Sequence, residues 1–76
     1  MSEYVWNIEN LPIWFQIELS RIEIKQNFTV KELTDKQAIH LNVLLSLLDL
    51  VEKGRVIAEV KDGVVRYHYN EGEKKK

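Results

Sequence analysis

An Asp-Gly dipeptide at positions 62 and 63 separates two runs of alternating β-forming residues, 55–61 and 64–70. A type I′ turn needs positive φ at both central positions, and Asp-Gly is one of the few pairs that accept it. A two-residue turn also fixes which residues face each other across the strands. The sequence therefore predicts a β-hairpin in which Lys61 faces Val64 and Val56 faces Tyr69.

This register divides the hairpin side chains between two faces. Glu59 faces Arg66 on one side, so opposite charges lie together there. The other side is apolar, and we expect it to be buried against the rest of the fold. Its members are Val56, Ala58, Val60, Val65, Tyr67 and Tyr69.

Residues 34–54 are rich in leucine and predict one long helix. Thr34 and Gln37 have the spacing of a capping box, and Gly54 is a usual helix terminator. A helix with apolar residues nearly all round must be covered on more than one side. One apolar face consists of Ile39, Val43, Leu47, Leu50 and Val51, and a second consists of Leu41, Leu44, Leu45 and Leu48.

A first helix is predicted over residues 11–25, because Asn10 is a favourable cap and Pro12 fits a first helical turn. Residues 17–25 also alternate as a strand does. The alternation slips at residues 20–21, however, so a continuous strand would turn its apolar side chains to the wrong face. The helix is therefore the better interpretation.

The segment between these two helices predicts a short second helix. Thr29 and Glu32 again have the spacing of a capping box, and Leu33 ends the segment. Two arrangements stay open: Thr34 begins the long helix directly, or the short helix continues to a turn near residues 38–40. At the N-terminus, residues 4–8 alternate and form either a short strand or an arm docked through its aromatic side chains.

Length and composition limit the class of protein. The 76 residues make one small domain, placed at residues 1–70, and residues 71–76 are predicted to be a disordered charged tail. The net charge is −1 and there is no cysteine. No apolar run reaches the roughly 18 residues of a membrane span, and the N-terminus lacks the pattern of a signal peptide. We expect a cytoplasmic, intracellular protein with no membrane partner.

Residues that carry catalysis or hold cofactors are sparse. His40 and His68 lie on different predicted elements, and no metal-ligand spacing connects them. No order of serine, histidine and aspartate suggests a nucleophile, and there is no glycine-rich phosphate loop. We expect no enzymatic activity, no metal and no cofactor.

The order of helix, short helix, long helix and hairpin resembles the winged-helix family. The resemblance rests on residues 28–33 (FTVKEL), on Val43, Leu47, Leu50 and Gly54, and on the following hairpin, and it covers about residues 11–70. It implies an α+β fold of three helices and a C-terminal two-stranded β-hairpin wing. A short N-terminal strand at residues 4–8 would be compatible with this fold. It also implies a small DNA-binding protein of the transcription-regulator type.

In DNA-binding members of that family the third helix reads the major groove and the wing meets phosphate. The polar and basic residues that fit these roles are Lys31, Lys36, His40, Asn42, Arg55, Lys61 and Arg66. The face that would read DNA also carries the leucines Leu41, Leu44, Leu45 and Leu48, which cannot pair with base edges, and Asp49 repels phosphate. The alternative is a winged helix used for protein–protein contact, which reads no DNA.

Self-association is the last expectation. The first and third predicted helices carry more apolar surface than one small core can cover, and no disulfide or metal compensates. We therefore predict a homodimer, which would also place two wings symmetrically on a palindromic duplex. The predicted interface consists of Leu11, Trp14, Phe15, Leu41, Leu44, Leu45 and Leu48.

Overall fold

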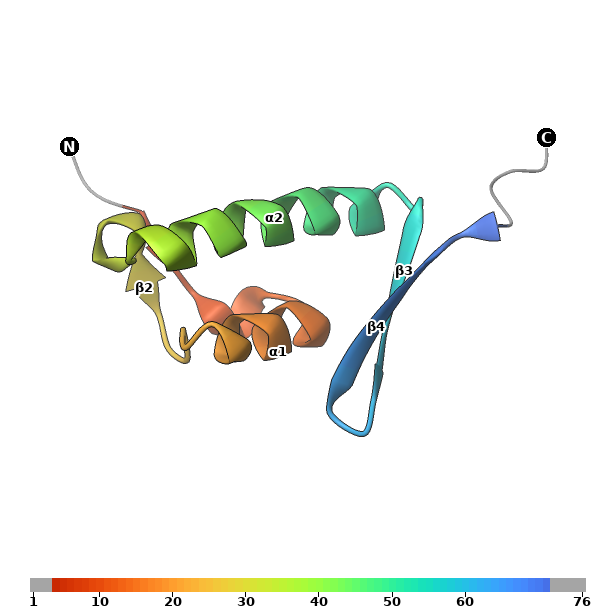
Figure 1. Ribbon diagram of the computed structural model, residues 1–76, viewed down its shortest axis with the longest axis horizontal. Coiled ribbons are helices and arrows are strands. Elements are labelled where there is room, and N and C mark those ends of the chain that lie inside the picture. The colour runs from red at the N-terminus through yellow and green to blue at the C-terminus, as the bar shows by residue number, and fades with distance from the viewer. Residues whose placement is uncertain (1–3, 72–76) are drawn as a thin grey trace.

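The computed structural model describes residues 4–71 and contains two α-helices and two antiparallel strand pairs (Figure 1). The fold is therefore α+β, as predicted, and it is consistent with a winged-helix-like arrangement, but it has two helices and not three. Of the predicted tail, only Glu71 lies within the described residues. The elements in chain order are β1 (Val5–Trp6), the 3₁₀ turn η1 (Ile8–Asn10), α1 (Ile13–Arg21), β2 (Phe28–Thr29), the 3₁₀ turn η2 (Val30–Glu32), α2 (Asp35–Glu52), β3 (Val56–Lys61) and β4 (Val64–Tyr69).

The helix α2 begins and ends at the signals present in the sequence. Thr34 Oγ1 accepts a hydrogen bond from the Gln37 N–H at 3.1 Å, and Gln37 Oε1 accepts one from the Thr34 N–H at 2.9 Å. At the other end Gly54 has a φ of +80°, and its N–H donates to the Val51 carbonyl at 3.1 Å. Thr34 therefore begins the long helix directly, and no turn interrupts it near residues 38–40.

The helix α1 is shorter than predicted, because the chain turns back after Arg21. Glu23 adopts a left-handed φ of +69°, and the N–H of Ile24 donates to the Leu19 carbonyl at 2.9 Å. This turn carries the Ile24 side chain into the core, where it is 5% exposed. The prediction of a helix to residue 25 was wrong because a left-handed terminator is usually glycine, and glutamate gives no such signal.

The predicted second helix is replaced by η2, a single 3₁₀ turn. The capping box does form, with the Thr29 N–H donating to Glu32 Oε1 at 3.2 Å. Leu33 is extended, however, at φ −84° and ψ 145°, and Thr34 caps α2 immediately after it. The prediction of three helices was wrong because the three residues of η2 are fewer than one α-helical turn of about 3.6 residues.

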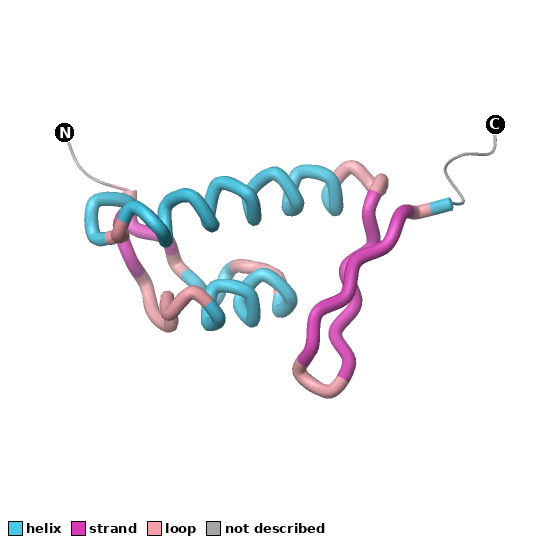
Figure 2. Tube along the Cα trace, in the orientation of Figure 1, coloured by secondary structure: helices cyan, strands magenta, loops and turns pink. Residues whose placement is uncertain are grey.

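The N-terminal segment forms a short strand, one of the two alternatives that the sequence left open. Val5 pairs with Thr29 and Trp6 with Phe28 in an antiparallel ladder. The Trp6 ring stacks on the Phe28 ring with centroids 5.7 Å apart. This small sheet is separate from the hairpin sheet and lies at the N-terminal end of α2 (Figure 2).

The hairpin has the predicted register. The pairs run from Lys61 with Val64 to Val56 with Tyr69. Asp62 and Gly63 have φ values of +55° and +76°, as the turn requires. The local signals of this element were therefore sufficient to place every strand residue opposite its partner.

Burial of the hairpin differs from the prediction at two positions. Val60 is 41% exposed and Tyr69 is 77% exposed, although both lie on the face expected to be buried. Val60 is close to the turn and Tyr69 is at the open end of the hairpin, and the hairpin reaches past the helices on the turn side (Figure 1). At each end of this face one residue is buried and its cross-strand partner is exposed: Val65 is 8% exposed opposite Val60, and Val56 is 8% exposed opposite Tyr69.

The core lies between α1, α2 and the hairpin. Phe15 and Leu19 of α1 are fully buried, and they pack with Leu41 and Leu44 of α2 and Val65 of β4, among others. A helix as short as α1 gains most of its stability from such packing. The hairpin is fastened to α1 by a hydrogen bond from the Tyr67 hydroxyl to Glu18 Oε2 at 2.6 Å.

Candidate interaction surface

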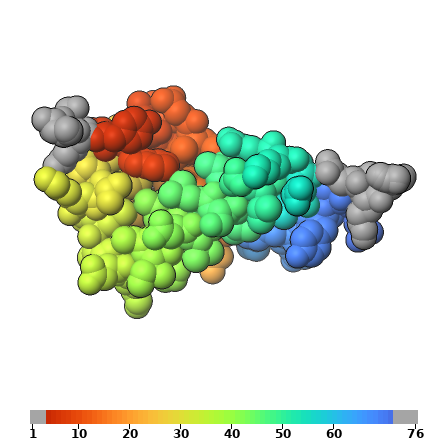
Figure 3. Space-filling model, turned by 90° about the horizontal axis from the view of Figure 1, so that it is seen from above, coloured from red at the N-terminus to blue at the C-terminus, as the bar shows by residue number. Residues whose placement is uncertain are grey.

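The solvent side of α2 carries an apolar stripe whose N-terminal half is exposed and whose C-terminal half is partly covered by the rest of the fold. Ile39 is 64% exposed and Val43 is 55% exposed, and Leu47 and Leu50 are half-buried. Their spacings of four, four and three residues place them along one side of the helix. We call these four residues the outer face of α2. Figure 3 looks down onto this side of the molecule, where α2 runs across the surface.

The structure buries the leucine face of α2 that we expected to point outward. Leu41 and Leu44, expected on the outward side, are 4% and 7% exposed in the core, whereas Ile39 and Val43 face solvent. Both faces have helical periodicity, so the pattern alone could not decide which one α1 covers. The choice depends on tertiary packing against Phe15 of α1.

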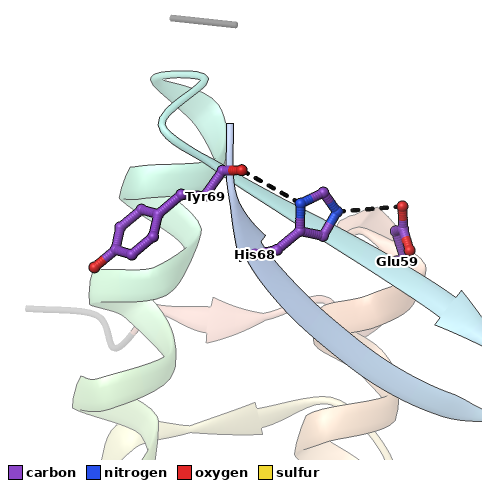
Figure 4. Close-up of polar contacts among 3 residues, drawn as sticks. All are labelled: Glu59, His68 and Tyr69. Atoms are coloured by element: carbon purple, nitrogen blue, oxygen red, sulfur yellow. Dashed lines mark hydrogen bonds and ion pairs between the residues drawn. The ribbon is translucent and has the colours of Figure 1, made fainter. Parts of the chain in front are cut away.

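Tyr69 continues the apolar surface at the C-terminal end of α2. A shallow hollow of about 290 Å³ is lined by Leu47, Leu50, Val56, Tyr67, His68 and Tyr69. In Figure 4 the Tyr69 ring projects beside α2, whereas His68 points the other way, toward Glu59. His68 Nε2 lies 3.3 Å from Glu59 Oε2, and His68 Nδ1 lies 3.3 Å from the Tyr69 carbonyl oxygen. The aromatic ring and the contact between His68 and Glu59 thus occupy opposite sides of β4.

Charges flank the outer face at both ends. Asp35 is in the first turn of α2, and Lys53 caps its C-terminus. Lys53 Nζ lies 3.1 Å from Asp49 Oδ2 in a pair that is 60% exposed on both sides. Because the 18 residues of α2 make about five turns, Asp35 and Lys53 lie in line along the helix.

The residues predicted to form a dimer interface lie mostly inside the single chain. Trp14, Phe15, Leu41 and Leu44 are buried in the core, and Leu11, Leu45 and Leu48 are half-buried against it. One copy of the chain therefore covers the side chains that we expected a second copy to cover. On α2 the large apolar side chains that are exposed to solvent are Ile39 and Val43, which were not among the predicted interface residues.

The residues predicted to contact DNA are all exposed but lie at separate places. Lys36 and His40 share a hollow of about 330 Å³ with Arg21 of α1, which the sequence did not single out. Glu23, Ile22, Thr34 and Gln37 line the same hollow. Asn42 is on another side of α2, Lys31 is in η2, and Arg55, Lys61 and Arg66 belong to the hairpin region. The structure thus brings together two of the seven predicted residues and adds one new cation.

The side chains that commonly bind metal ions are spread apart among residues 4–71. In this part of the chain no three His, Cys, Asp or Glu side chains gather closely enough to hold a metal ion. The largest electrostatic perturbation falls on Tyr67, whose pKa is raised above its usual range by burial and by its hydrogen bond to Glu18. The Tyr67 hydroxyl connects β4 to α1 through this hydrogen bond. None of the helices in the described range is long and apolar enough to span a bilayer.

Comparison with protein-family models, with curated proteins and with solved structures finds no match for this chain.

Proposed function

We propose that this chain is a protein-interaction domain that docks another protein surface on the outer face of α2. The observation that carries this proposal is the exposed apolar stripe of that helix, together with Tyr69 at its end. Exposed apolar patches of this kind are typical of surfaces that bind proteins. The short helix α1 and the hairpin then serve as the support that holds α2 in place.

Ile39 and Val43 are unfavourable choices for the solvent side of a helix. β-branched residues have lower helix propensity than alanine, by a few tenths of a kcal/mol each. Burying apolar surface contributes about 25 cal/mol per Å² to stability, and a side chain that stays in water does not make this contribution. Since these side chains are 64% and 55% exposed, the fold itself gains little from them. A docked partner would bury them and recover that free energy.

DNA binding is the second candidate function. The observation that favours it is the hollow where the cations Arg21 and Lys36 lie with His40 and Glu23, because neighbouring cations attract phosphate. Two features weigh against it. The helix that would cross the DNA backbone in a winged helix is replaced here by η2. Asp35 and Asp49 lie on α2 near the positions that would face phosphate, and the chain has a net charge of −1.

The proposal is tested with one variant and a matched control. Ile39→Glu with Val43→Glu places two charges on the outer face, and Ile13→Glu places one on the exposed side of α1, where Ile13 is 62% exposed. Each chain is immobilised and used to retain proteins from a lysate, including free copies of itself. We expect proteins that bind the wild type and Ile13→Glu but not the double variant. Equal retention by all three would contradict the proposal.

The DNA candidate has its own test. Binding to random duplex is measured at roughly 50 and 200 mM salt for the wild type and for Arg21→Ala with Lys36→Ala. If these cations touch phosphate, the variant should bind every duplex more weakly, and the salt slope should fall by about two units. The companion variant Lys61→Ala with Arg66→Ala tests the hairpin in the same way. Absence of binding at the lower salt would eliminate this candidate.

A further inference from the structure

We propose that the outer face of α2 docks onto the same face of a second copy of this chain, with the two α2 helices antiparallel. This inference rests on the proposed function and names its partner. The axis of the two-fold dimer would pass close to Val43 and Leu47, near the middle of α2. A self-complementary surface is the requirement for such an isologous contact.

The apolar stripe is symmetric about its own midpoint. In an antiparallel pair centred near residue 45, Ile39 meets Leu50 of the partner subunit, and Val43 meets Leu47 of the partner subunit. Each contact occurs twice because of the two-fold axis. A large apolar side chain therefore meets another at each of the four positions, so a second copy covers the whole stripe.

The flanking charges favour the antiparallel direction. Asp35 and Lys53 lie in line at opposite ends of α2, on one side of the stripe. Antiparallel helices place Asp35 beside Lys53 of the partner subunit, and the reverse pair forms at the other end. In a parallel pair the two copies of Asp35 would lie at the same end on opposite flanks of the seam, and no contact between Asp35 and Lys53 of the partner subunit could form. The helix dipoles also oppose each other favourably only in the antiparallel arrangement.

Tyr69 extends the contact beyond the helix. It lies at the C-terminal end of α2, beside Leu47 and Leu50. In the antiparallel pair that end meets the N-terminal end of the other helix, so the Tyr69 ring would reach toward Ile39 of the partner subunit. An 18-residue helix is about 27 Å long, and one helical stripe with two tyrosines falls short of the roughly 800 Å² per partner of a standard interface. We therefore expect a dimer that dissociates in the micromolar range.

Sedimentation equilibrium tests whether the second copy binds. Over a series from low to high micromolar concentration, the wild type should pass from 9.0 kDa toward twice that mass. Ile39→Glu with Val43→Glu should stay at 9.0 kDa while its far-ultraviolet circular dichroism remains that of the wild type. Ile13→Glu should associate as the wild type does.

The outcomes separate this inference from the proposed function. A wild type that remains at 9.0 kDa throughout would overturn the proposal that the partner is a second copy of this chain. The proposal that the outer face of α2 docks another protein would then be decided by the retention experiment alone. A double variant that associates as strongly as the wild type overturns the contact surface proposed here, because the dimer then uses another face.

Disulfide trapping tests the direction of the helices. The chain contains no cysteine, so single substitutions give unambiguous cross-links. Asp35→Cys and Lys53→Cys chains are mixed in equal amounts and oxidised. We expect the mixed disulfide between the two variants to exceed its statistical share. Preferential linkage of each variant to itself would overturn the antiparallel arrangement.

Discussion

Replacing Tyr67 by phenylalanine removes one hydroxyl group at the junction between the hairpin and α1. That hydroxyl donates to Glu18 Oε2 at 2.6 Å, and the Tyr67 ring meets the Trp14 ring edge-on with centroids 5.6 Å apart. Phenylalanine keeps the ring contact and loses only the hydrogen bond. A hydrogen bond to a charged group contributes roughly 1.5–3 kcal/mol. Because water can partly replace it at this half-buried site, we expect a loss of about 1–2 kcal/mol.

Urea denaturation measures this loss, and Tyr69→Phe is the matched control. Tyr69 is on the same strand and 77% exposed, so its hydroxyl should contribute less than about 0.5 kcal/mol in the monomer. A double-mutant cycle of Tyr67→Phe with Glu18→Gln should show a coupling energy of about 1 kcal/mol. Equal losses for Tyr67→Phe and Tyr69→Phe, or no coupling to Glu18, would refute this account of the junction.

The hydrogen bond between Tyr67 and Glu18 also makes the stability of the fold depend on pH. Burial, followed by the hydrogen bond to Glu18, raises the pKa of Tyr67 above its usual range. The folded state therefore holds this proton more tightly than the unfolded chain does. Its contribution to stability is complete below the unfolded pKa of about 10 and is lost as the pH rises above that value. The urea midpoint of the wild type should therefore fall between about pH 9 and about pH 11, and that of Tyr67→Phe should fall by less, because the variant has no hydroxyl to titrate at this position.

Three further substitutions test the fold. Glu23→Gly should raise the free energy of unfolding by about 0.5–1 kcal/mol, because φ at this position is +69° and glycine accepts it without strain. A fall in the thermal midpoint would contradict that reading of the turn. Gly63→Val should cost on the order of 1 kcal/mol, all of it from the φ of +76°, since an added Cβ meets nothing within 4 Å. Gly63→Asn, which tolerates positive φ, should cost less by the same denaturation measurement. Leu44→Glu should unfold the chain, because Leu44 is 7% exposed in the core, and a folded variant by circular dichroism would place it elsewhere.

The parts of the fold that local chemistry determines could be predicted from the sequence. Asp62 and Gly63 fix the hairpin register because the turn geometry acts over two residues. Thr34, Gln37 and Gly54 fix the ends of α2 in the same way. Each of these signals is satisfied by neighbours in the chain, so no knowledge of the tertiary structure was needed.

The parts that depend on tertiary packing could not be predicted. When leucine, isoleucine and valine occur on several sides of a helix, the sequence does not show which side packs against the neighbouring element. In this structure Leu41 and Leu44 are buried in the core, whereas Ile39 and Val43 are exposed. The candidate surface was therefore placed on the wrong side of α2. Glu23 adopts its left-handed φ because Ile24 is buried beyond it, a cause that lies outside the local sequence.

A dilution series followed by methyl NMR tests most directly whether the outer face of α2 is a contact between copies. The methyl signals of Ile39 and Val43 report on that face, and those of Ile13, which is 62% exposed on α1, serve as the internal control in the same sample. We expect the Ile39 and Val43 methyl shifts to change with concentration along one binding curve while the Ile13 shifts stay constant. Constant shifts at Ile39 and Val43, or changes confined to Ile13, would contradict the contact between two copies proposed for this face.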